Sequence, residues 1–294
     1  MSAPAVVPVH ASDVVIVSSS DLAIYKTVAA SIGAGPKSRL VNVTLPAGKN
    51  YDSATHTIWA AKPDAIVALG ARALDLTSRE FQGVPIVFGM VADTYSYAEA
   101  KEVAGIALIP SESQMLQAIR RVLPRAGEIA VIFDPDRSSR DVENLVSAAK
   151  RMGIKVRAIR FAPDSDVQGI LSSLTGECDC LIIYPDPVLL SDKVFAEIVF
   201  KAFALGVPSV GYASAFARKG ALMSVEADYS SMGSDISGIL GQVLKGTSPG
   251  VIGVCPPSAI KITVNKAVAD ELHLDIPPNS LNSIELIAVR PGSR

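Results

Sequence analysis

The run Asp13-Val-Val-Ile-Val-Ser18 decides the fold, because its four consecutive β-branched residues predict a strand that is buried on both faces of a parallel sheet. A matching run, Glu128-Ile-Ala-Val-Ile-Phe133, follows later in the chain. Other strand-like runs keep one order in both halves, shifted by roughly 115 to 120 residues. They are centred near Val15, Asn42, Val67 and Val87, and again near Ala130, Arg157, Ile182 and Ser209.

Each of these runs is followed by polar or Gly-rich residues and then by a stretch of helix length, the order that produces right-handed βαβ units. We therefore expect an α/β fold with two Rossmann-like lobes, each built on a parallel sheet, joined by a hinge. The length of 294 residues exceeds the usual size of a single core. Small ligands bind outside the carboxyl ends of parallel strands, so the sequence predicts a ligand cleft between the lobes.

The lobe boundaries follow from the repeat. Residues 1–109 should form the N-terminal lobe, with 229–250 packed on it, and residues 110–228 the C-terminal lobe, with 251–294. The connections near Ile109, Ala227 and Val251 are the expected hinges, which absorb backbone rotation while each lobe moves as a rigid body.

The expected elements can be given by range. In the first lobe the strands are 13–18, 40–45, 65–69, 85–88 and 103–108, and the helices are 21–32, 52–61 and one beginning at 70. After a helix over 111–123, capped by Ser111 and Gln114, the strands are 128–133, 154–161, 180–184, 207–212, 221–226 and 260–264. The remaining helices are 138–152, 166–174, 191–205, 230–244 and 266–272.

Composition excludes several classes of protein. Apolar residues make up 49% and charged residues 19%, which argues against disorder. The net charge is −2 with scattered cations, so we expect no nucleic-acid partner. No apolar stretch is long enough to cross a bilayer. Met1 to His10 has no Lys, no Arg and no apolar h-region, which leaves two interpretations open: a cytosolic protein, or an exported one whose leader has been removed.

Cysteine and histidine give no sign of a metal site. Cys178 and Cys180 lie too close along an extended segment for an ordinary disulfide, and with Cys255 they are expected to be small buried side chains. The three histidines show no ligand spacing. We therefore expect no metal ion and no cofactor.

Polar residues follow the strands of the first lobe. Ser18, Ser19 and Ser20 precede a helix start, where hydroxyl and backbone N–H groups suit an anion such as a carboxylate, although plain helix capping is the alternative. Ala71 and Arg72 lie at another helix start, and the Arg72 guanidinium could hold a carboxylate or be a solvated surface group. Tyr25, in the first predicted helix, completes this set of candidate ligand contacts.

Carboxylates follow the strands of both lobes. Asp93, Asp134 and Asp186 each come within a few residues of a strand end, and the ammonium group of a solute would neutralise such a buried carboxylate. The alternative is turn chemistry, since Asp134 and Asp186 each precede a proline. Ser138 and Ser139 are candidate contacts beside Asp134.

Aromatic residues and a last polar group complete the candidate site. Tyr184, Tyr212 and Phe216 could stack on an apolar or aromatic solute, with a place in the core as the alternative for each. Ser214 and Asp228 follow the last two strands of the second lobe and could line the cleft or belong to the hinge.

An ordered set of short motifs resembles the ABC-transporter substrate-binding protein family that includes the tryptophan and tyrosine binders, over roughly residues 60 to 280. The motifs are Pro85-Ile-Val-Phe-Gly-Met-Val-Ala-Asp93, Val103-Ala-Gly-Ile106, Gln114 to Pro124, Ile129-Ala-Val-Ile-Phe-Asp-Pro135, Tyr184-Pro-Asp186, Val207-Pro-Ser-Val210, Lys219-Gly-Ala-Leu222, Ala227-Asp-Tyr229 and Ile276-Pro-Pro278. The resemblance implies a type I periplasmic-binding-protein fold that closes on a small solute and delivers it to an ABC permease. The chain departs from the family pattern at Arg137-Ser-Ser-Arg140, Asp186-Pro187 and Gly70-Ala-Arg-Ala73.

These observations favour a binding protein over an enzyme. The sequence has no dinucleotide fingerprint, phosphate loop or nucleophile elbow, so we expect no catalytic residues. The expected partner is a small solute, first of all an amino acid with an apolar or aromatic side chain, bound by a periplasmic or other extracytoplasmic monomer. Two alternatives remain: the ligand-sensing part of a signalling receptor, or a binder of a nucleoside or sugar. A DNA-binding repressor is disfavoured because no helix-turn-helix precedes the first strand.

Overall fold

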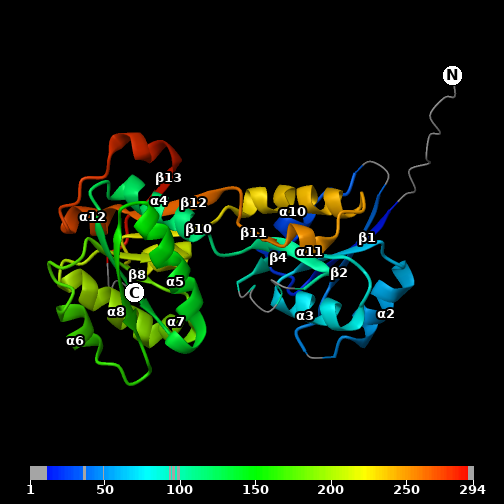
Figure 1. Cartoon of the computed structure of the whole chain (residues 1–294), viewed down its shortest axis with the longest axis horizontal. Coiled ribbons are helices and arrows are strands. Elements are labelled where there is room, and N and C mark those ends of the chain that lie inside the picture. The colour runs from blue at the N-terminus through cyan, green and yellow to red at the C-terminus, as the bar shows by residue number, and fades with distance from the viewer. Residues whose placement is uncertain are drawn as a thin grey trace. The chain divides into compact units, whose positions relative to one another are not determined.

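Two sheets organise the chain (Figure 1). The computed structural model describes residues 12–35, 38–48, 50–92, 94, 97 and 100–290, so the candidate Asp93 and the segment from Met1 to His10 lie outside the described residues. The chain divides into unit 1, comprising Met1–Ile109 and Ala227–Ala259, and unit 2, comprising Pro110–Glu226 and Ile260–Arg294.

Unit 1 is built on one parallel sheet. Its strand order is β11 (Val254–Cys255), β5 (Val103–Ala107), β4 (Ile86–Val91), β3 (Ala65–Leu69), β1 (Asp13–Ser18) and β2 (Arg39–Thr44). The helices are α1 (Ala23–Ala30), α2 (Asp52–Ala61), α3 (Ala71–Glu80), α10 (Tyr229–Val243) and α11 (Pro249–Ile252).

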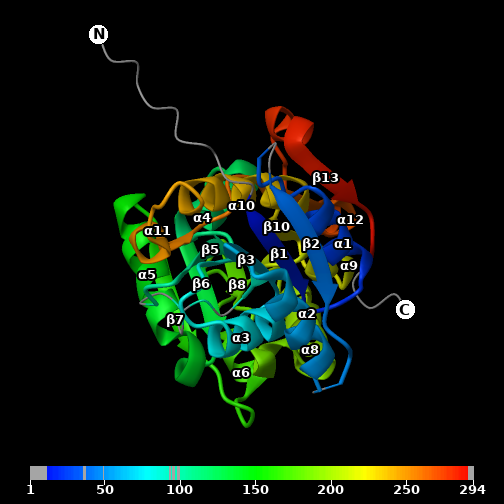
Figure 2. The ribbon, with the colours of Figure 1, turned by 90° about the vertical axis from the view of Figure 1, so that its right-hand side faces the viewer.

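The alternation of side chains along β1 divides the core of unit 1 into two layers. Val14 and Ile16 pack in a cluster with residues of α1 and α10, whereas Val15 and Val17 pack in a cluster with residues of α2 and α3. Figure 2 shows α1 and α10 on one side of the sheet and α2 and α3 on the other. Both faces of β1 are therefore buried, as the apolar run predicts.

Unit 2 repeats this plan on a second sheet. Its strand order is β13 (Ile284–Ile287), β12 (Ile260–Asn265), β10 (Met223–Ala227), β9 (Ser209–Gly211), β8 (Cys180–Ile183), β6 (Glu128–Phe133) and β7 (Lys155–Arg160). The pairs β6–β7, β6–β8, β8–β9, β9–β10 and β12–β13 are parallel. The helices are α4 (Glu112–Val122), α5 (Pro135–Arg151), α6 (Val167–Ser172), α7 (Pro187–Leu190), α8 (Asp192–Ala204), α9 (Ser214–Arg218), α12 (Lys266–Glu271) and the 3-10 turn Pro278–Ser283. The predicted α/β class with two parallel-sheet lobes is confirmed.

The structure differs from the expected lobe boundaries near the end of the chain. Residues 251–259, expected in the C-terminal lobe, belong to unit 1 because Val254 and Cys255 pair in parallel with β5. Residues 227 and 228 also lie in unit 1. A strand of two residues is too short to show periodicity, so no pattern in the sequence predicts it.

The local start of α5 matters for the site. The sequence predicts a helix from 138, but the helix begins at Pro135, because Asp134 caps it by accepting from the Asp136 N–H at 3.0 Å and proline suits the first helical position. Ser138 and Ser139 therefore lie inside the first turns of the helix, on different sides of it. The predicted capping box of α4 is confirmed: Ser111 N–H donates to Gln114 Oε1 at 2.9 Å and Gln114 N–H donates to Ser111 Oγ at 3.3 Å.

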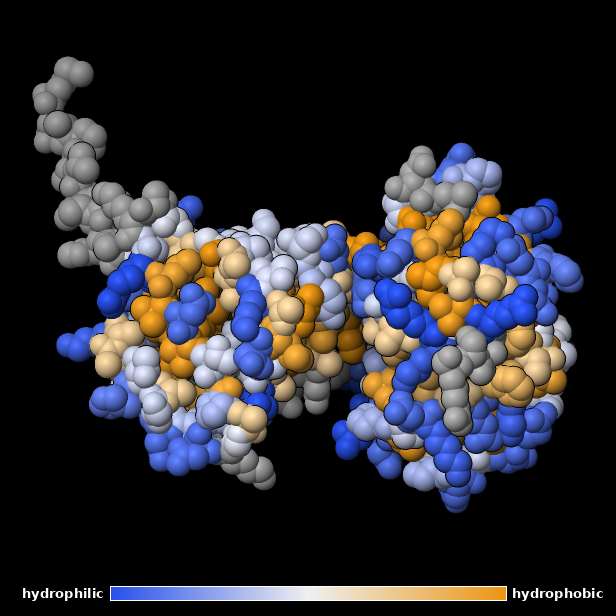
Figure 3. Space-filling view, turned by 180° about the vertical axis from the view of Figure 1, so that it is seen from behind, coloured by the Kyte–Doolittle hydropathy of each residue, from blue (hydrophilic) through white to orange (hydrophobic). Residues whose placement is uncertain are grey.

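Some large apolar side chains reach the surface, and Figure 3 shows hydrophobic patches among hydrophilic residues on both units. The most exposed include Val251, Leu22, Phe200 and Trp59. Within the described ranges, no helix combines the length and the apolar content needed to cross a membrane.

Candidate functional site

The strand orders place a switch point in each sheet. In unit 1, β1 lies between β2 and β3, and in unit 2, β6 lies between β7 and β8, so successive connections leave in opposite directions. Ligands of open parallel sheets bind outside the carboxyl ends of the strands at such points. The residues that follow β1 and β3, and those that follow β6 and β8, include most of the candidates predicted from the sequence.

Asp186 joins the ends of two strands in unit 2. Its side chain is 3% exposed, and its Oδ2 accepts the Asp134 backbone N–H at 2.7 Å. Its Oδ1 accepts a short hydrogen bond from the hydroxyl of Ser138, which is itself buried. Asp134 follows β6 and Asp186 follows β8, so this carboxylate holds the β8 end against the β6–α5 turn.

Burial raises the pKa of the Asp186 carboxyl above its usual range. The hydrogen bonds from Ser138 and from the Asp134 backbone act in the opposite direction, and the carboxylates of Asp134 and Asp141 raise the pKa further. Each carboxylate oxygen has a second lone pair that can accept another donor. A cation that reached this group would stabilise its ionised form.

Two tyrosines lie beside this carboxylate. The rings of Tyr184 and Tyr212 meet edge to face with centroids 5.3 Å apart. Burial raises the pKa of both hydroxyls, and the carboxylates of Glu112 and Asp141 raise it further. Tyr184, 8% exposed, also forms a hydrogen bond with Asp141, while Tyr212 is partly exposed. The carboxyl end of the second sheet is therefore both aromatic and acidic.

The sequence did not single out Glu112 or Asp141. Glu112 begins α4 and Asp141 lies in the second turn of α5, positions where acidic residues are common for helix stability alone. Only the packing of these helices against the sheet brings both carboxylates toward Tyr212. No local sequence signal distinguishes them.

The structure gives other candidates of unit 2 a local role. Phe216 is 7% exposed and packs edge to face on Phe195 at 4.5 Å, so its ring belongs to the core. The Ser214 N–H, at the start of α9, donates to Glu226 at 3.1 Å. Ser139 Oγ donates to the Pro135 carbonyl at 2.6 Å, a bond within α5, whereas the neighbouring Ser138 makes the contact with Asp186. Direct contact of these residues with a solute stays a prediction.

In unit 1, a serine caps a helix that is distant in the sequence. Ser19 Oγ accepts the Ala73 N–H at 2.9 Å, a first-turn donor of α3, whose own N-cap Gly70 has no side chain. The Ser19 N–H donates to the Leu69 carbonyl at 2.8 Å. A Cβ on Gly70 would lie 2.7 Å from Ser19 Oγ and 2.8 Å from the Tyr25 hydroxyl, so Tyr25, Ser19 and Gly70 are brought together.

Arg72 connects the loops of unit 1. Its guanidinium donates to the Ser19 carbonyl at 3.0 Å, to the Tyr51 hydroxyl at 3.0 Å and to the Gly48 carbonyl at 3.2 Å, with a further short bond to the Pro46 carbonyl. It also lies 5.4 Å from the centre of the Tyr51 ring. Most of its donors are therefore used within the protein, and its predicted grip on a solute carboxylate stays a prediction.

The remaining candidates serve the backbone. Ser18 is buried and its carbonyl accepts the Leu45 N–H at 2.9 Å, whereas Ser20 Oγ accepts the Leu22 N–H at 3.2 Å. Ala71 is the first residue of α3 and is exposed. Asp228 caps α10 by accepting the Ser230 N–H at 2.9 Å, and its expected place in the cleft or the hinge stays a prediction. Among the described residues, no three His, Cys, Asp or Glu side chains gather in a way that could hold a metal ion.

The match to a family model identifies the family of this chain. A family model described as ABC transporter substrate binding protein matches residues 47–285. A tyrosine-binding protein of Clostridioides difficile (strain R20291) is 24% identical over 222 residues, a match that covers 72% of this chain but 64% of that relative's length.

Solved structures show the same fold. The ligand-free, open structure of a substrate binding protein with adhesive properties from Clostridium difficile has a TM-score of 0.75 at 18% identity, covering 95% of this chain and 100% of the other. The ABC domain from Streptococcus pneumonia in complex with L-Trp has a TM-score of 0.59 at 20% identity, with the same coverage.

Proposed function

The chain belongs to the ABC transporter substrate binding protein family, and we propose that it binds a free amino acid with an apolar or aromatic side chain at the carboxyl end of the second sheet. The family and the type I periplasmic-binding-protein fold predicted from the sequence are both confirmed. The family is one of binding proteins rather than enzymes. The choice of ligand is our proposal.

The observation that carries this proposal is the buried Asp186 carboxylate. It is held by the Asp134 N–H and the Ser138 hydroxyl, and burial disfavours its charge. The ammonium group of an amino acid would supply the missing cation. The Glu112 and Asp141 carboxylates, which lie close enough to Tyr212 to raise its pKa, favour a cationic group as well.

The aromatic pair supports an apolar or aromatic side chain on the solute. Tyr184 and Tyr212 already pack edge to face, and Tyr212 keeps part of its surface exposed. An aromatic ring can add to such a pair by offset or edge contact, and a cation gains from lying over a ring face. The tyrosine-binding relative and the L-Trp-bound neighbour point to the same class of ligand.

We further propose that the loaded protein delivers its solute to an ABC permease outside the cytoplasm, as its family membership suggests. Closure of the two lobes on the solute and the monomeric state stay predictions. Small-angle scattering tests both: a radius of gyration that falls on addition of the bound amino acid indicates closure, and the forward scattering gives the mass.

A thermal-shift screen followed by titration calorimetry tests the ligand class. L-Tyrosine, L-tryptophan, L-phenylalanine and L-leucine are compared with nucleosides and sugars, and any hit is compared with its analogue lacking the amino group. We expect one amino acid to raise the melting temperature through a site that its deaminated analogue does not occupy, so that the analogue binds Asp186→Asn as tightly as it binds wild type. A screen in which only solutes without an amine stabilise the fold contradicts the proposal.

Asp179 provides a matched control for Asp186. Its Oδ2 accepts the Gly127 and Glu128 N–H groups at 2.8 and 2.9 Å, so it ties β8 to β6 at the amino end of the sheet as Asp186 does at the carboxyl end. Asp186→Asn should weaken amino-acid binding at least about tenfold, whereas Asp179→Asn should retain it. Equal binding by both variants would show that Asp186 does not contact the bound amino acid.

A further inference from the structure

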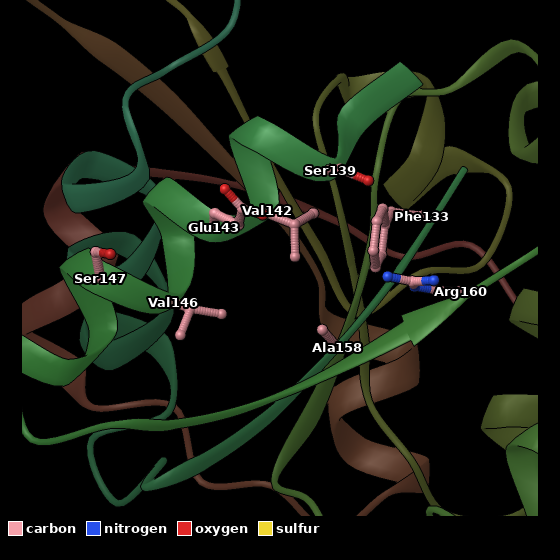
Figure 4. Close-up of a pocket in the computed structure, with 8 residues that line it drawn as sticks. All are labelled: Phe133, Ser139, Val142, Glu143, Val146, Ser147, Ala158 and Arg160. Carbon is pink, nitrogen blue, oxygen red and sulfur yellow. The ribbon is translucent and has the colours of Figure 1, made fainter. Parts of the chain in front are cut away.

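A hollow lies on the flank of unit 2, between helix α5 and the edge strand β7 (Figure 4). Its volume is about 370 Å³, within the usual size range of small-molecule sites. Phe133, Val142, Val146 and Ala158 form its apolar lining. The Val146 side chain is 38% exposed although it is apolar, so this surface is open to a ligand.

The hollow exists because of one small side chain. Ala158 lies in the middle of β7 and is exposed, where strands ordinarily carry β-branched or aromatic residues. Its methyl group leaves the space between the strand and the α5 side chains unfilled. The lining on α5 extends from Ser139 to Ser147, which is about 12 Å along a helix and leaves room for a small aromatic or branched acid.

The charges at the hollow differ from those of the amino-acid site. Figure 4 shows Arg160 beside Phe133 and Ser139 at one end and Ser147 beside Val146 at the other. Within the part of the chain that the structure describes, no hydrogen bond or ion pair engages Arg160, in contrast to Arg157 on the opposite face of β7, which donates to the Ser173 carbonyl at 3.0 Å. Arg160 is therefore a cation with an apolar hollow beside it.

We propose that this hollow is a second binding site, for a small monocarboxylate with an apolar body. The carboxylate pairs with the Arg160 guanidinium, which can donate two parallel hydrogen bonds, and the apolar body covers Val142, Val146 and Ala158. Glu143, also in the lining, disfavours a second acidic group on the ligand.

The site is separate from the proposed amino-acid site. Ser138 donates to Asp186 on one side of α5, whereas Ser139, the next residue, lines the hollow on another. The ligand classes differ as well, because Asp186 requires a cationic group and Arg160 an anionic one. A carboxylate without an amine is thus the ligand that distinguishes the two sites.

Titration calorimetry with 3-phenylpropanoate tests the proposal, using the full chain and variants whose melting temperatures confirm folding. Wild-type protein should bind this acid, and Arg160→Gln should bind it at least about tenfold more weakly, as loss of a charge-assisted pair predicts. Arg157→Gln, which removes the same charge from the same strand, should bind as the wild type does. No binding by the wild type, or equal loss in both variants, overturns the proposal.

Two further measurements locate the bound acid. Ala158→Leu fills the hollow, so it should abolish binding without lowering the melting temperature, and undiminished binding by a folded Ala158→Leu variant overturns the proposal. Asp186→Asn should retain full affinity for 3-phenylpropanoate. Loss of binding in that variant would place the acid at the amino-acid site and reject a second site, whatever the amino-acid titrations show.

Discussion

The backbone N–H of Asp134 donates a 2.7 Å hydrogen bond to Oδ2 of Asp186, so a single carboxylate connects the ends of β6 and β8. Asp186 is nearly fully buried, and Ser138 supplies its second donor. The arrangement positions a charged group at the switch point of the sheet, where burial disfavours the charge until a cation arrives.

Removing this carboxylate should destabilise the protein because its two donors remain. Asp186→Ala leaves the Asp134 N–H and the Ser138 hydroxyl without their acceptor, and each unsatisfied buried donor costs about 1–3 kcal/mol of unfolding free energy. The double variant Asp186→Ala/Ser138→Ala removes one of these donors and should recover part of the loss. Urea unfolding monitored by circular dichroism measures the unfolding free energy of Asp186→Ala, Ser138→Ala and the double variant. A loss in the double variant equal to the sum of the two single losses would show that the hydroxyl and the carboxylate do not interact.

Binding should depend on pH through Asp186. Burial raises the pKa of this carboxyl in the folded protein, so it is protonated at a higher pH than an ordinary aspartate, whose pKa is about 3.9. Because an ammonium ligand needs the ionised form, affinity for the amino acid should fall as the pH is lowered from neutral through this raised pKa. Titration calorimetry over a pH series measures the fall, and an affinity that is constant down to the range of ordinary aspartates would contradict the assignment.

The same shift has the opposite effect on the stability of the protein without ligand. A raised folded-state pKa means that the folded form binds this proton more tightly than the unfolded form does. The contribution of Asp186 to the unfolding free energy should therefore increase as the pH falls through the folded pKa, until the unfolded aspartate is protonated too. The difference between wild type and Asp186→Asn across a pH series isolates it. A wild-type protein that loses unfolding free energy relative to Asp186→Asn on acidification would argue against a raised pKa.

Gly70 and Gly83 form a matched pair in unit 1. Their φ angles are 88° and 85°, a region in which alanine is strained, but a Cβ has open space at Gly83 and lies 2.7 Å from Ser19 Oγ at Gly70. Gly70→Ala should therefore lower the melting temperature clearly more than Gly83→Ala does. Equal losses would show that Ser19 and Tyr25 make room for the added Cβ at no cost in stability.

Arg72 should act through structure. Arg72→Met keeps much of the apolar stem but loses the bonds to the Ser19, Pro46 and Gly48 carbonyls, and we expect a loss of about 1–3 kcal/mol of unfolding free energy. Tyr51→Phe, which removes one acceptor of Arg72, should cost less. Denaturant unfolding compares them, and an Arg72→Met variant as stable as the wild type would assign the guanidinium to another role, such as holding a solute carboxylate.

Much of the fold could be read from local patterns. The run Val14 to Val17 predicts a strand buried on both faces, and its alternate residues do pack in two separate clusters. The sequence does not predict the short helices α7 and α9, because four and five residues are too few to show a helical period. Pro187 is typical of a turn but here begins a helix.

The sequence located the site only in part. Asp186 could be predicted because it comes within a few residues of a strand end, whereas its donors Asp134 N–H and Ser138 lie 52 and 48 residues away and meet it only through the pairing of β6 with β8. Arg72 shows the reverse case. It lies at a strand end as predicted, but carbonyls from a loop in the segment 46–48 occupy its donors, a contact that no local pattern indicates.

The most direct test of the proposed function is a parallel calorimetric titration of wild type, Asp186→Asn and Asp179→Asn with the amino acid that the thermal screen identifies. We predict binding of about one ligand per chain to the wild type and to Asp179→Asn, and loss of at least about tenfold in affinity in a folded Asp186→Asn variant. Undiminished affinity in Asp186→Asn would contradict the claim that this buried carboxylate receives the ammonium group of the solute.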